Sequence, residues 1–349
     1  MKKRTVLIGV LLIALLLTGC AGSGAAAEGD FVCTSGLGNH TLTAIGETMY
    51  ALTQEASGEV SLHAFDRTKG AHTVTAVEVN SDELFATMQG QTYNLAADGK
   101  KLYAMGARGS GGIYCIDPKT GEAARVGFYP SLEITAWTIA DDTAYVGAKD
   151  AEGIGVYAIR TDKLELFAEP GEPVLHFDAP THRGEISSID KAPEGLLVTL
   201  QVGEEPWRTL LFDLKTAQTI PVADDVYSDR TVQNGDLRLV CERTADGAQA
   251  VLLDGSAQRR VVAELDWLYR PIAAGKGFVL ERMGEDAART VLVVDETGEV
   301  RSAQLPEGAG PLLGGDARYA YLWDNAEPDA AATLLALDLE TLEIVNRFE

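Results

Sequence analysis

Residues 113–121 read IYCIDPKTG, an apolar run followed at once by a polar turn. The run suits a β-strand because β-branched and aromatic residues favour extended backbone. In the turn, the Asp117 side chain can accept hydrogen bonds from following amides, Pro118 presets φ, and Gly121 tolerates a left-handed conformation. The segment therefore predicts a strand that ends in a tight turn.

Turns of similar chemistry recur about every 40 to 50 residues. Each follows a short apolar run, and a second apolar run lies upstream of it. The turns begin at Asp66, Asp117, Arg160, Asp213, Asp254, Asp295 and Asp338. The upstream runs cover 49–52, 102–105, 144–146, 196–198, 237–240, 278–280 and 319–322. With a weaker strand on either side of the pair, each unit holds four short strands, as in one blade of a β-propeller.

Seven units predict an all-β fold, a seven-bladed β-propeller of four-stranded antiparallel blades. The rival is a two-sheet sandwich or a pair of them, which does not predict one turn chemistry repeated seven times. Hydrophobic residues make up 46% of the chain, enough for a large buried core. Residues 31–33 are expected to close the ring as a strand of the last blade, since an open sheet edge is a liability.

The unit resembles the YVTN and quinoprotein-like propeller repeats, in which a Leu-Tyr-Val strand precedes Val-x-Val-Ile-Asp and then Thr-Gly. The best match is residues 102–104 followed by 113–121. Gly70, Gly121 and Gly298 keep the glycine of the turn. The resemblance implies a propeller over nearly all of the mature chain. The Trp-docking motif of the quinone-dependent dehydrogenases is not visible, so we expect no quinone and no other cofactor.

The first residues read as a targeting segment. Three basic residues precede a short apolar core, and Leu17-Thr18-Gly19-Cys20 resembles a bacterial lipobox, which implies lipidation of Cys20. We expect a lipoprotein signal peptide at 1–19, a lipidated flexible tether at 20–30 and the propeller domain at 31–349. The alternative is an ordinary secretory signal that contains a cysteine. An extracytoplasmic location, lipid-anchored to the bacterial cell membrane, follows from the first interpretation.

The chain is strongly acidic, with a formal net charge of −23. Nucleic acid and anionic lipid headgroups should repel it, so no nucleic-acid partner is expected, and membrane attachment must come from the lipid. The acidity serves solubility in the simpler interpretation. A cationic partner or calcium is the alternative.

Patterns for known catalytic chemistry are missing from the sequence. There is no His-Glu-x-x-His, Gly-x-Ser-x-Gly or phosphate-binding loop, and we expect no catalytic residues. His176, Asp178 and His182 fall in a segment, 176–187, that we expect to be a loop; we interpret them as solvated rather than as metal ligands. Cys115 and Cys241 lie in strand runs of different blades, so we do not expect them to pair.

Propeller topology indicates a binding face. Loops between blades and loops between second and third strands share one face around the central channel. Aromatic and basic residues, the types that dominate binding hot spots, map to these loops. The candidate ligand-binding residues are Arg183, Trp207, Tyr227, Arg230, Trp267, Tyr269, Arg270 and Trp323. The alternative is that Trp267 and Tyr269 pack between blades; Trp137 is expected in the core.

These observations favour a non-enzymatic lipoprotein of the cell envelope, whose propeller binds or scaffolds a protein or an envelope glycan. The alternative is a propeller enzyme, either a glycan hydrolase or lyase or a degenerate dehydrogenase-like protein. A structural subunit of an envelope assembly is a third hypothesis. Fold class alone does not choose among them.

Overall fold

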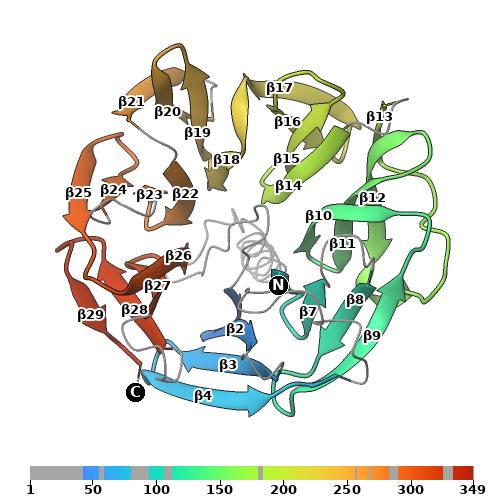
Figure 1. Ribbon diagram of the computed structural model, residues 1–349, viewed down its shortest axis with the longest axis horizontal. Helices are drawn as coiled ribbons and strands as arrows, with labels where there is room; N and C mark the ends of the chain where they lie inside the picture. Colours follow the sequence, from blue (N-terminus) through green and yellow to red (C-terminus); the bar gives the residue numbers. More distant parts are fainter. Residues whose placement is uncertain are drawn as a thin grey trace, which may run out of the picture.

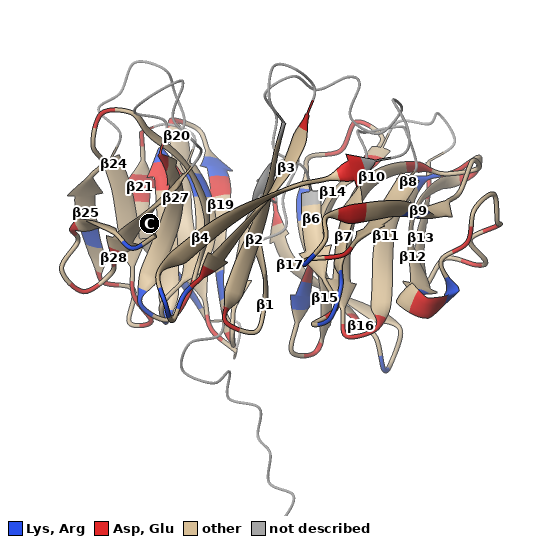
Figure 2. Ribbon diagram, turned by 90° about the horizontal axis from the view of Figure 1, so that it is seen from below, with Lys and Arg blue, Asp and Glu red and all other residues tan. Residues whose placement is uncertain are grey.

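Seven β-sheets form a ring around a central axis (Figure 1). The computed structural model describes residues 42–54, 59–79, 94–105, 112–179, 184–255, 258–266, 269–282, 290–324 and 333–348. Each blade contains four antiparallel strands in chain order, which run between the two faces of the ring (Figure 2), and the sheet of blade 2 has a fifth, parallel strand at its outer edge. The prediction of a seven-bladed propeller is confirmed. The expected signal peptide, tether and closing strand at 31–33 lie outside the described residues.

The strands follow the chain from the channel outward in every blade. Blade 1 contains β1 (Thr43–Ile45), β2 (Thr48–Gln54), β3 (Val60–Asp66) and β4 (Ala71–Ala76), and blade 2 contains β6 (Asn94–Ala97), β7 (Leu102–Met105), β8 (Gly112–Ile116) and β9 (Glu122–Phe128). Blade 3 contains β10 (Glu133–Ala140), β11 (Thr143–Lys149), β12 (Gly153–Arg160) and β13 (Leu175–Asp178), and blade 4 contains β14 (Gly184–Ala192), β15 (Gly195–Val202), β16 (Arg208–Asp213) and β17 (Gln218–Asp224).

The remaining blades repeat this order. Blade 5 contains β18 (Val226–Asn234), β19 (Leu237–Thr244), β20 (Gly247–Leu253) and β21 (Arg259–Leu265), and blade 6 contains β22 (Tyr269–Ala274), β23 (Gly277–Arg282), β24 (Thr290–Val294) and β25 (Val300–Gln304). Blade 7 contains β26 (Ala309–Gly315), β27 (Tyr319–Asp324), β28 (Thr333–Asp338) and β29 (Ile344–Asn346). A short strand, β5 (Glu78–Val79), pairs in parallel with β9 at the outer edge of blade 2.

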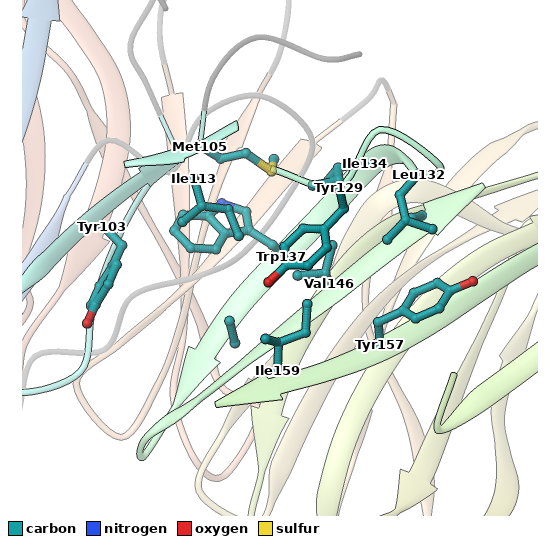
Figure 3. Close-up of a cluster of buried hydrophobic side chains, with 12 residues drawn as sticks. Tyr103, Met105, Ile113, Tyr129, Leu132, Ile134, Trp137, Val146, Tyr157 and Ile159 are labelled. Atoms are coloured by element: carbon teal, nitrogen blue, oxygen red, sulfur yellow. The ribbon is translucent and has the colours of Figure 1, made fainter. Parts of the chain in front are cut away.

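The apolar runs are continuous because the blades are buried on both faces. Successive side chains of a strand point to opposite faces of its sheet. In β7, Leu102 and Ala104 pack toward blade 1, whereas Tyr103 and Met105 pack toward blade 3. Among the described residues, buried apolar side chains form seven such clusters, one at each junction between neighbouring blades. Figure 3 shows the cluster between blades 2 and 3.

The turn between third and fourth strands has the predicted chemistry in six blades. Asp117 Oδ1 accepts hydrogen bonds from the amides of Lys119 and Thr120, at 2.8 and 3.1 Å. Equivalent carboxylate-to-amide bonds are made by Asp66, Asp213, Asp254, Asp295 and Asp338. The amide of Lys119 lowers the pKa of Asp117, because a hydrogen bond to the carboxylate stabilises its charged form.

The fourth residue after the turn aspartate is left-handed in four blades, with or without glycine. The φ angles are 68° at Gly70, 74° at Gly121, 55° at Ala217 and 62° at Leu342. Sequence comparison of the turns by their glycines therefore underestimates how regular they are. The aspartate and the flanking strands impose the turn geometry. Glycine only removes the free-energy cost of the left-handed conformation.

Close approach of a neighbouring blade explains why two of these turns have glycine at the left-handed position. A Cβ on Gly121 would lie 2.2 Å from the carbonyl oxygen of Ala76 in blade 1. A Cβ on Gly70 would lie 2.5 Å from the carbonyl oxygen of Arg347 in blade 7. No side chain fits at either position without movement of the adjacent backbone.

Blade 3 departs from the repeat, and two predictions fail there. Arg160 does not begin a tight turn: the chain passes through the 3-10 helix η1 (Thr161–Lys163) and a long connection, 164–174, before β13. An arginine has no carboxylate to accept turn amides, and its side chain pairs with Asp142 and Asp162 instead. The loop predicted at 176–187 is also wrong in part. It contains the end of β13, which pairs with β12, and the start of β14.

The ring closes between blades 7 and 1. Phe65, Tyr321 and Phe348 share one hydrophobic cluster at this seam. Asp316, at the turn between β26 and β27, accepts a hydrogen bond from the Tyr321 hydroxyl at 2.5 Å and lies 3.6 Å from the Arg67 guanidinium. In the part of the chain that the structure describes, side chains hold the seam without a shared strand. No helix in that part has the length and apolar character needed to span a bilayer.

Candidate functional site

Half of the sequence-predicted binding residues fall where their side chains are not described. Arg183 and Trp267 lie outside the described residues, and the side chains of Tyr227 and Arg230, in β18, do so as well. Trp207 precedes β16 and packs, half-buried, against the cluster between blades 4 and 5. Their role in binding stays a prediction.

The other three predicted residues lie at three separate junctions. Tyr269 is buried between blades 5 and 6, and Trp323 is buried between blades 7 and 1. Arg270 donates to Glu281 at 3.0 Å and to the carbonyl of Leu312, where blade 6 meets blade 7. The structure therefore does not bring these three side chains together. Trp137 is buried in the core, as expected.

A pocket of about 660 Å³ lies at the edge of blade 3. It is formed by the connection from β9 to β10, the turn between β11 and β12, and residues 169–173 of the long connection before β13. Its polar lining includes Asp150, Glu152, Tyr157, Glu169, Glu172 and His176. Two of these three walls are loops of the face on which propeller topology predicts binding.

Asp150 organises the wall of the pocket. Its Oδ1 accepts hydrogen bonds from the amides of Glu152 and Gly153, at 2.7 and 2.8 Å, which fixes the turn. Its Oδ2 accepts a hydrogen bond from the Tyr157 hydroxyl at 2.6 Å and lies 3.5 Å from Nε2 of His176. Tyr157 belongs to the cluster between blades 2 and 3, and in Figure 3 its hydroxyl points away from the other side chains of that cluster.

The pocket carries negative charge. Among the described residues, four carboxylates line it, and no lysine or arginine does. Burial raises the pKa of Tyr157, and so do its hydrogen bond to Asp150 and the charges of Glu152 and Glu172. Burial would also raise the pKa of Asp150, but the Tyr157 hydroxyl and the turn amides outweigh it, so the pKa is lowered and the group stays ionised. In Figure 2 the loops beside β12 and β13 carry several acidic segments.

The connection that borders the pocket also exposes an aromatic side chain. Phe167 is 72% exposed, the highest value among the described large hydrophobic residues, and Leu166 beside it is 48% exposed. The Phe167 amide donates to the carbonyl of Phe128 at 2.8 Å, and the Phe128 amide donates to the carbonyl of Glu165 at 3.0 Å. The backbone of blade 2 thus holds this part of blade 3 in place.

Metal binding finds no support in the described residues. No group of three or more histidine, cysteine or acidic side chains there is arranged to hold a metal ion. His176 Nδ1 lies 3.7 Å from Asp178 Oδ1 on the outer strand β13, and His182 lies outside the described residues. Cys115 and Cys241 form no disulfide with each other and lie in blades 2 and 5, as expected.

A second pocket, of about 760 Å³, lies beside blade 2. Lys100, Lys101 and Lys119 line it, but so do Glu78, Asp117 and Glu122. Because the charges balance, this pocket selects less sharply for charge than the one in blade 3.

Sequence reasoning missed Asp150, Tyr157 and Phe167. The sequence did contain a signal for Asp150 and Tyr157. In three turns an aspartate accepts a hydrogen bond from a tyrosine five to seven residues later, and the other two pairs are Asp98 with Tyr103 and Asp316 with Tyr321. Nothing local marks Phe167, whose position depends on pairing with β9 about forty residues earlier.

Comparisons with known proteins support the fold. No family model and no curated protein match the chain. Among solved structures, a prolyl endopeptidase matches with a TM-score of 0.62 at 15% identity, over 89% of this chain and 49% of that one. A puromycin-hydrolysing peptidase of Mycobacterium tuberculosis matches with a TM-score of 0.59 at 10% identity, over 88% of this chain and 53% of that one. This chain thus spans about half the length of both peptidases.

A propeller of similar size also matches. The β-propeller domain of the Trilobed protease from Pyrococcus furiosus, described as having an open velcro topology, has a TM-score of 0.56 at 13% identity. The match covers 90% of this chain and 98% of that domain. At these identities the likeness establishes the fold alone.

Proposed function

We propose that this protein is an extracytoplasmic lipoprotein, anchored through Cys20, whose propeller acts as a binding or scaffolding module for a protein or envelope glycan. The lipobox-like sequence before Cys20 supports the anchor. The propeller is a rigid support: its junctions are filled by packed apolar clusters, and its turns are held by repeated hydrogen bonds. Rigid scaffolds with variable loops commonly carry binding sites.

One observation carries the proposal. Blade 3 abandons the repeated turn, and the connection that replaces it both exposes Phe167 and lines an acidic pocket. A turn that served only to link strands would keep the short form seen in the other blades. A connection this long inside a compact domain is commonly functional.

Crosslinking on intact cells tests binding. A photo-reactive amino acid is placed in turn at Phe167 in blade 3, Ile220 in blade 4, Val74 in blade 1 and Val261 in blade 5, all exposed. Reproducible adducts at one or more positions are expected, and protease or glycosidase treatment identifies the class of partner. If no position gives an adduct while the protein is present at normal levels, the binding function is wrong.

The anchor is tested separately. The Cys20→Ser variant should fail to incorporate an alkyne-labelled palmitate and should move from the membrane fraction to the soluble fraction. Equal labelling of both proteins would contradict lipidation at this residue.

A further inference from the structure

We infer that the edge of blade 3 binds a basic and apolar segment of a partner protein, with an arginine or lysine side chain in the acidic pocket and an adjoining apolar side chain against Phe167. This rests on the proposed binding function and names the chemistry of its partner.

The apolar half of the surface is held outward. Phe167 has a φ of 59°, a left-handed conformation that is unfavourable for a bulky residue. Backbone hydrogen bonds to Phe128 keep it there, and the two rings meet edge-on with centroids 5.1 Å apart. The Arg125 guanidinium lies over the Phe128 ring, 4.0 Å from its centre. An exposed ring that is already ordered loses little entropy on binding.

The acidic half of the surface adjoins it. Glu169, which lines the pocket, follows Phe167 by two residues, and Ser131, whose hydroxyl donates to Glu169 at 3.3 Å, follows Phe128 by three. The chain therefore places the pocket within one or two side-chain lengths of the aromatic pair. Glu152 and Glu172 both line the pocket and are exposed, so their carboxylates can receive a cation from outside.

Charge selects the occupant. A second copy of this chain, with a net charge of −23, would bring like charges to the pocket, and nucleic acid or an anionic membrane would do the same. A bare metal ion would need a group of ligands that the described residues do not provide. A guanidinium or ammonium group on an apolar peptide matches both halves at once, and complementary charge also speeds association.

Fluorescence anisotropy on the detergent-solubilised full-length protein tests this pairing. The probe is a labelled heptapeptide with one arginine between two leucines. Two matched peptides replace the arginine by glutamate or both leucines by serine. We expect the first peptide to bind at least about tenfold more tightly than either of the others, and its affinity to fall with added salt.

Two variants locate the binding. Glu152→Gln with Glu172→Gln removes two of the four negative charges, and Phe167→Asn removes the ring and introduces a residue that tolerates positive φ. Each should weaken binding of the first peptide about tenfold, without lowering the melting temperature. The controls Glu307→Gln, on the same face, and Ile220→Ser, in blade 4, should leave binding unchanged.

The outcomes separate this inference from the general function. Equal binding of the glutamate peptide, no binding of any peptide up to about 1 mM, or no effect of either variant overturns the inference. If adducts on cells form at other positions but not at 167, or if the adduct at 167 is a glycan, the binding function stands and this inference falls.

Discussion

Arg347 donates a hydrogen bond from Nη2 to the backbone carbonyl of Arg67, at 2.7 Å, although the two residues are 280 positions apart. The same guanidinium donates from Nη1 to the Tyr321 hydroxyl at 2.9 Å and lies 4.3 Å from the centre of the Tyr319 ring. One side chain from the last blade thus reaches the first blade and completes the ring. Fixing this contact requires all seven blades to be in place, which couples their stability.

Replacing this arginine should loosen the ring. Arg347→Ala removes two charge-assisted hydrogen bonds and a contact with an aromatic ring, and we expect the free energy of unfolding to fall by about 2–3 kcal/mol. Urea denaturation measures it. Lys215→Ala, in an exposed turn, is the control and should change the free energy by less than about 0.5 kcal/mol. An equally small change for Arg347→Ala would contradict this role at the seam.

Gly121 should be far less replaceable than Gly99. Both have positive φ, but a Cβ on Gly121 meets the carbonyl oxygen of Ala76, whereas one on Gly99 meets nothing within 4 Å. Gly99→Ala should cost about 1 kcal/mol, the cost of the left-handed conformation alone, and Gly121→Ala about 3 kcal/mol or more because blade 1 must also shift. Thermal unfolding of the two variants side by side decides the matter, and similar losses would mean that the approach of blade 1 is easily relaxed.

Ala217→Gly should stabilise the protein. Ala217 is exposed and has a φ of 55°, so glycine would relieve backbone strain without loss of packing. The gain is reduced by the greater freedom of glycine in the unfolded chain, and we expect about 0.5–1 kcal/mol net. Ala124→Gly, at an exposed position of β9, provides the matched control and should lower the free energy of unfolding by a similar amount. A loss at both sites would show that Ala217 is not strained.

Stability should fall as the pH drops from about 6.5 to about 4. His63 is buried, its Nδ1 lies 3.0 Å from Nε2 of His72, and burial, followed by the charge of His72, lowers the pKa of His63 to about 4. Between these pH values the unfolded chain binds a proton that the folded protein does not. The unfolded state is therefore favoured as the pH falls, by up to roughly 3 kcal/mol from this residue. Burial lowers the pKa of His72 as well, so its contribution has the same sign.

Urea denaturation at pH 7 and pH 4.5 measures the effect. His63→Gln keeps a polar side chain beside Thr53, whose hydroxyl lies 2.8 Å from His63 Nε2, and should flatten the dependence of the unfolding free energy on pH. His176→Gln, in the blade 3 pocket, serves as the control for a histidine in another blade. Identical pH dependence in the wild type and His63→Gln would exclude the buried histidine as the cause.

The fold could be predicted because its determinants are local and repeated. Strands such as Leu102–Met105 are apolar throughout because alternate side chains pack into the junctions on either side of the blade. Asp117 accepts hydrogen bonds from amides only two and three residues later in the chain. The same reasoning failed at Arg160, where the unit keeps its spacing but loses the carboxylate that makes the turn.

The candidate site could not be predicted because its determinants are distant in sequence. Whether Phe167 is buried or exposed depends on the pairing of its backbone with Phe128, and no periodicity records that pairing. Conversely, Trp323 is predicted to bind a ligand from its loop-adjacent position, and for Tyr269 the sequence leaves open both ligand binding and packing between blades. Their burial follows from the way neighbouring blades pack, which a single sequence does not display.

The turn aspartates have a consequence for the face of the ring on which they lie. The Lys69 side chain lowers the pKa of Asp66, backbone amides lower the pKa of Asp117 and Asp213, and hydrogen bonds at Asp295 and Asp338 outweigh burial and lower the pKa there as well. These carboxylates remain charged in acid that neutralises ordinary ones. Two rings that stacked through this face would have to remove water from several ionised carboxylates, which disfavours columns of stacked rings. At high density on a surface, copies of the protein are therefore expected not to associate through the face that carries the turn aspartates.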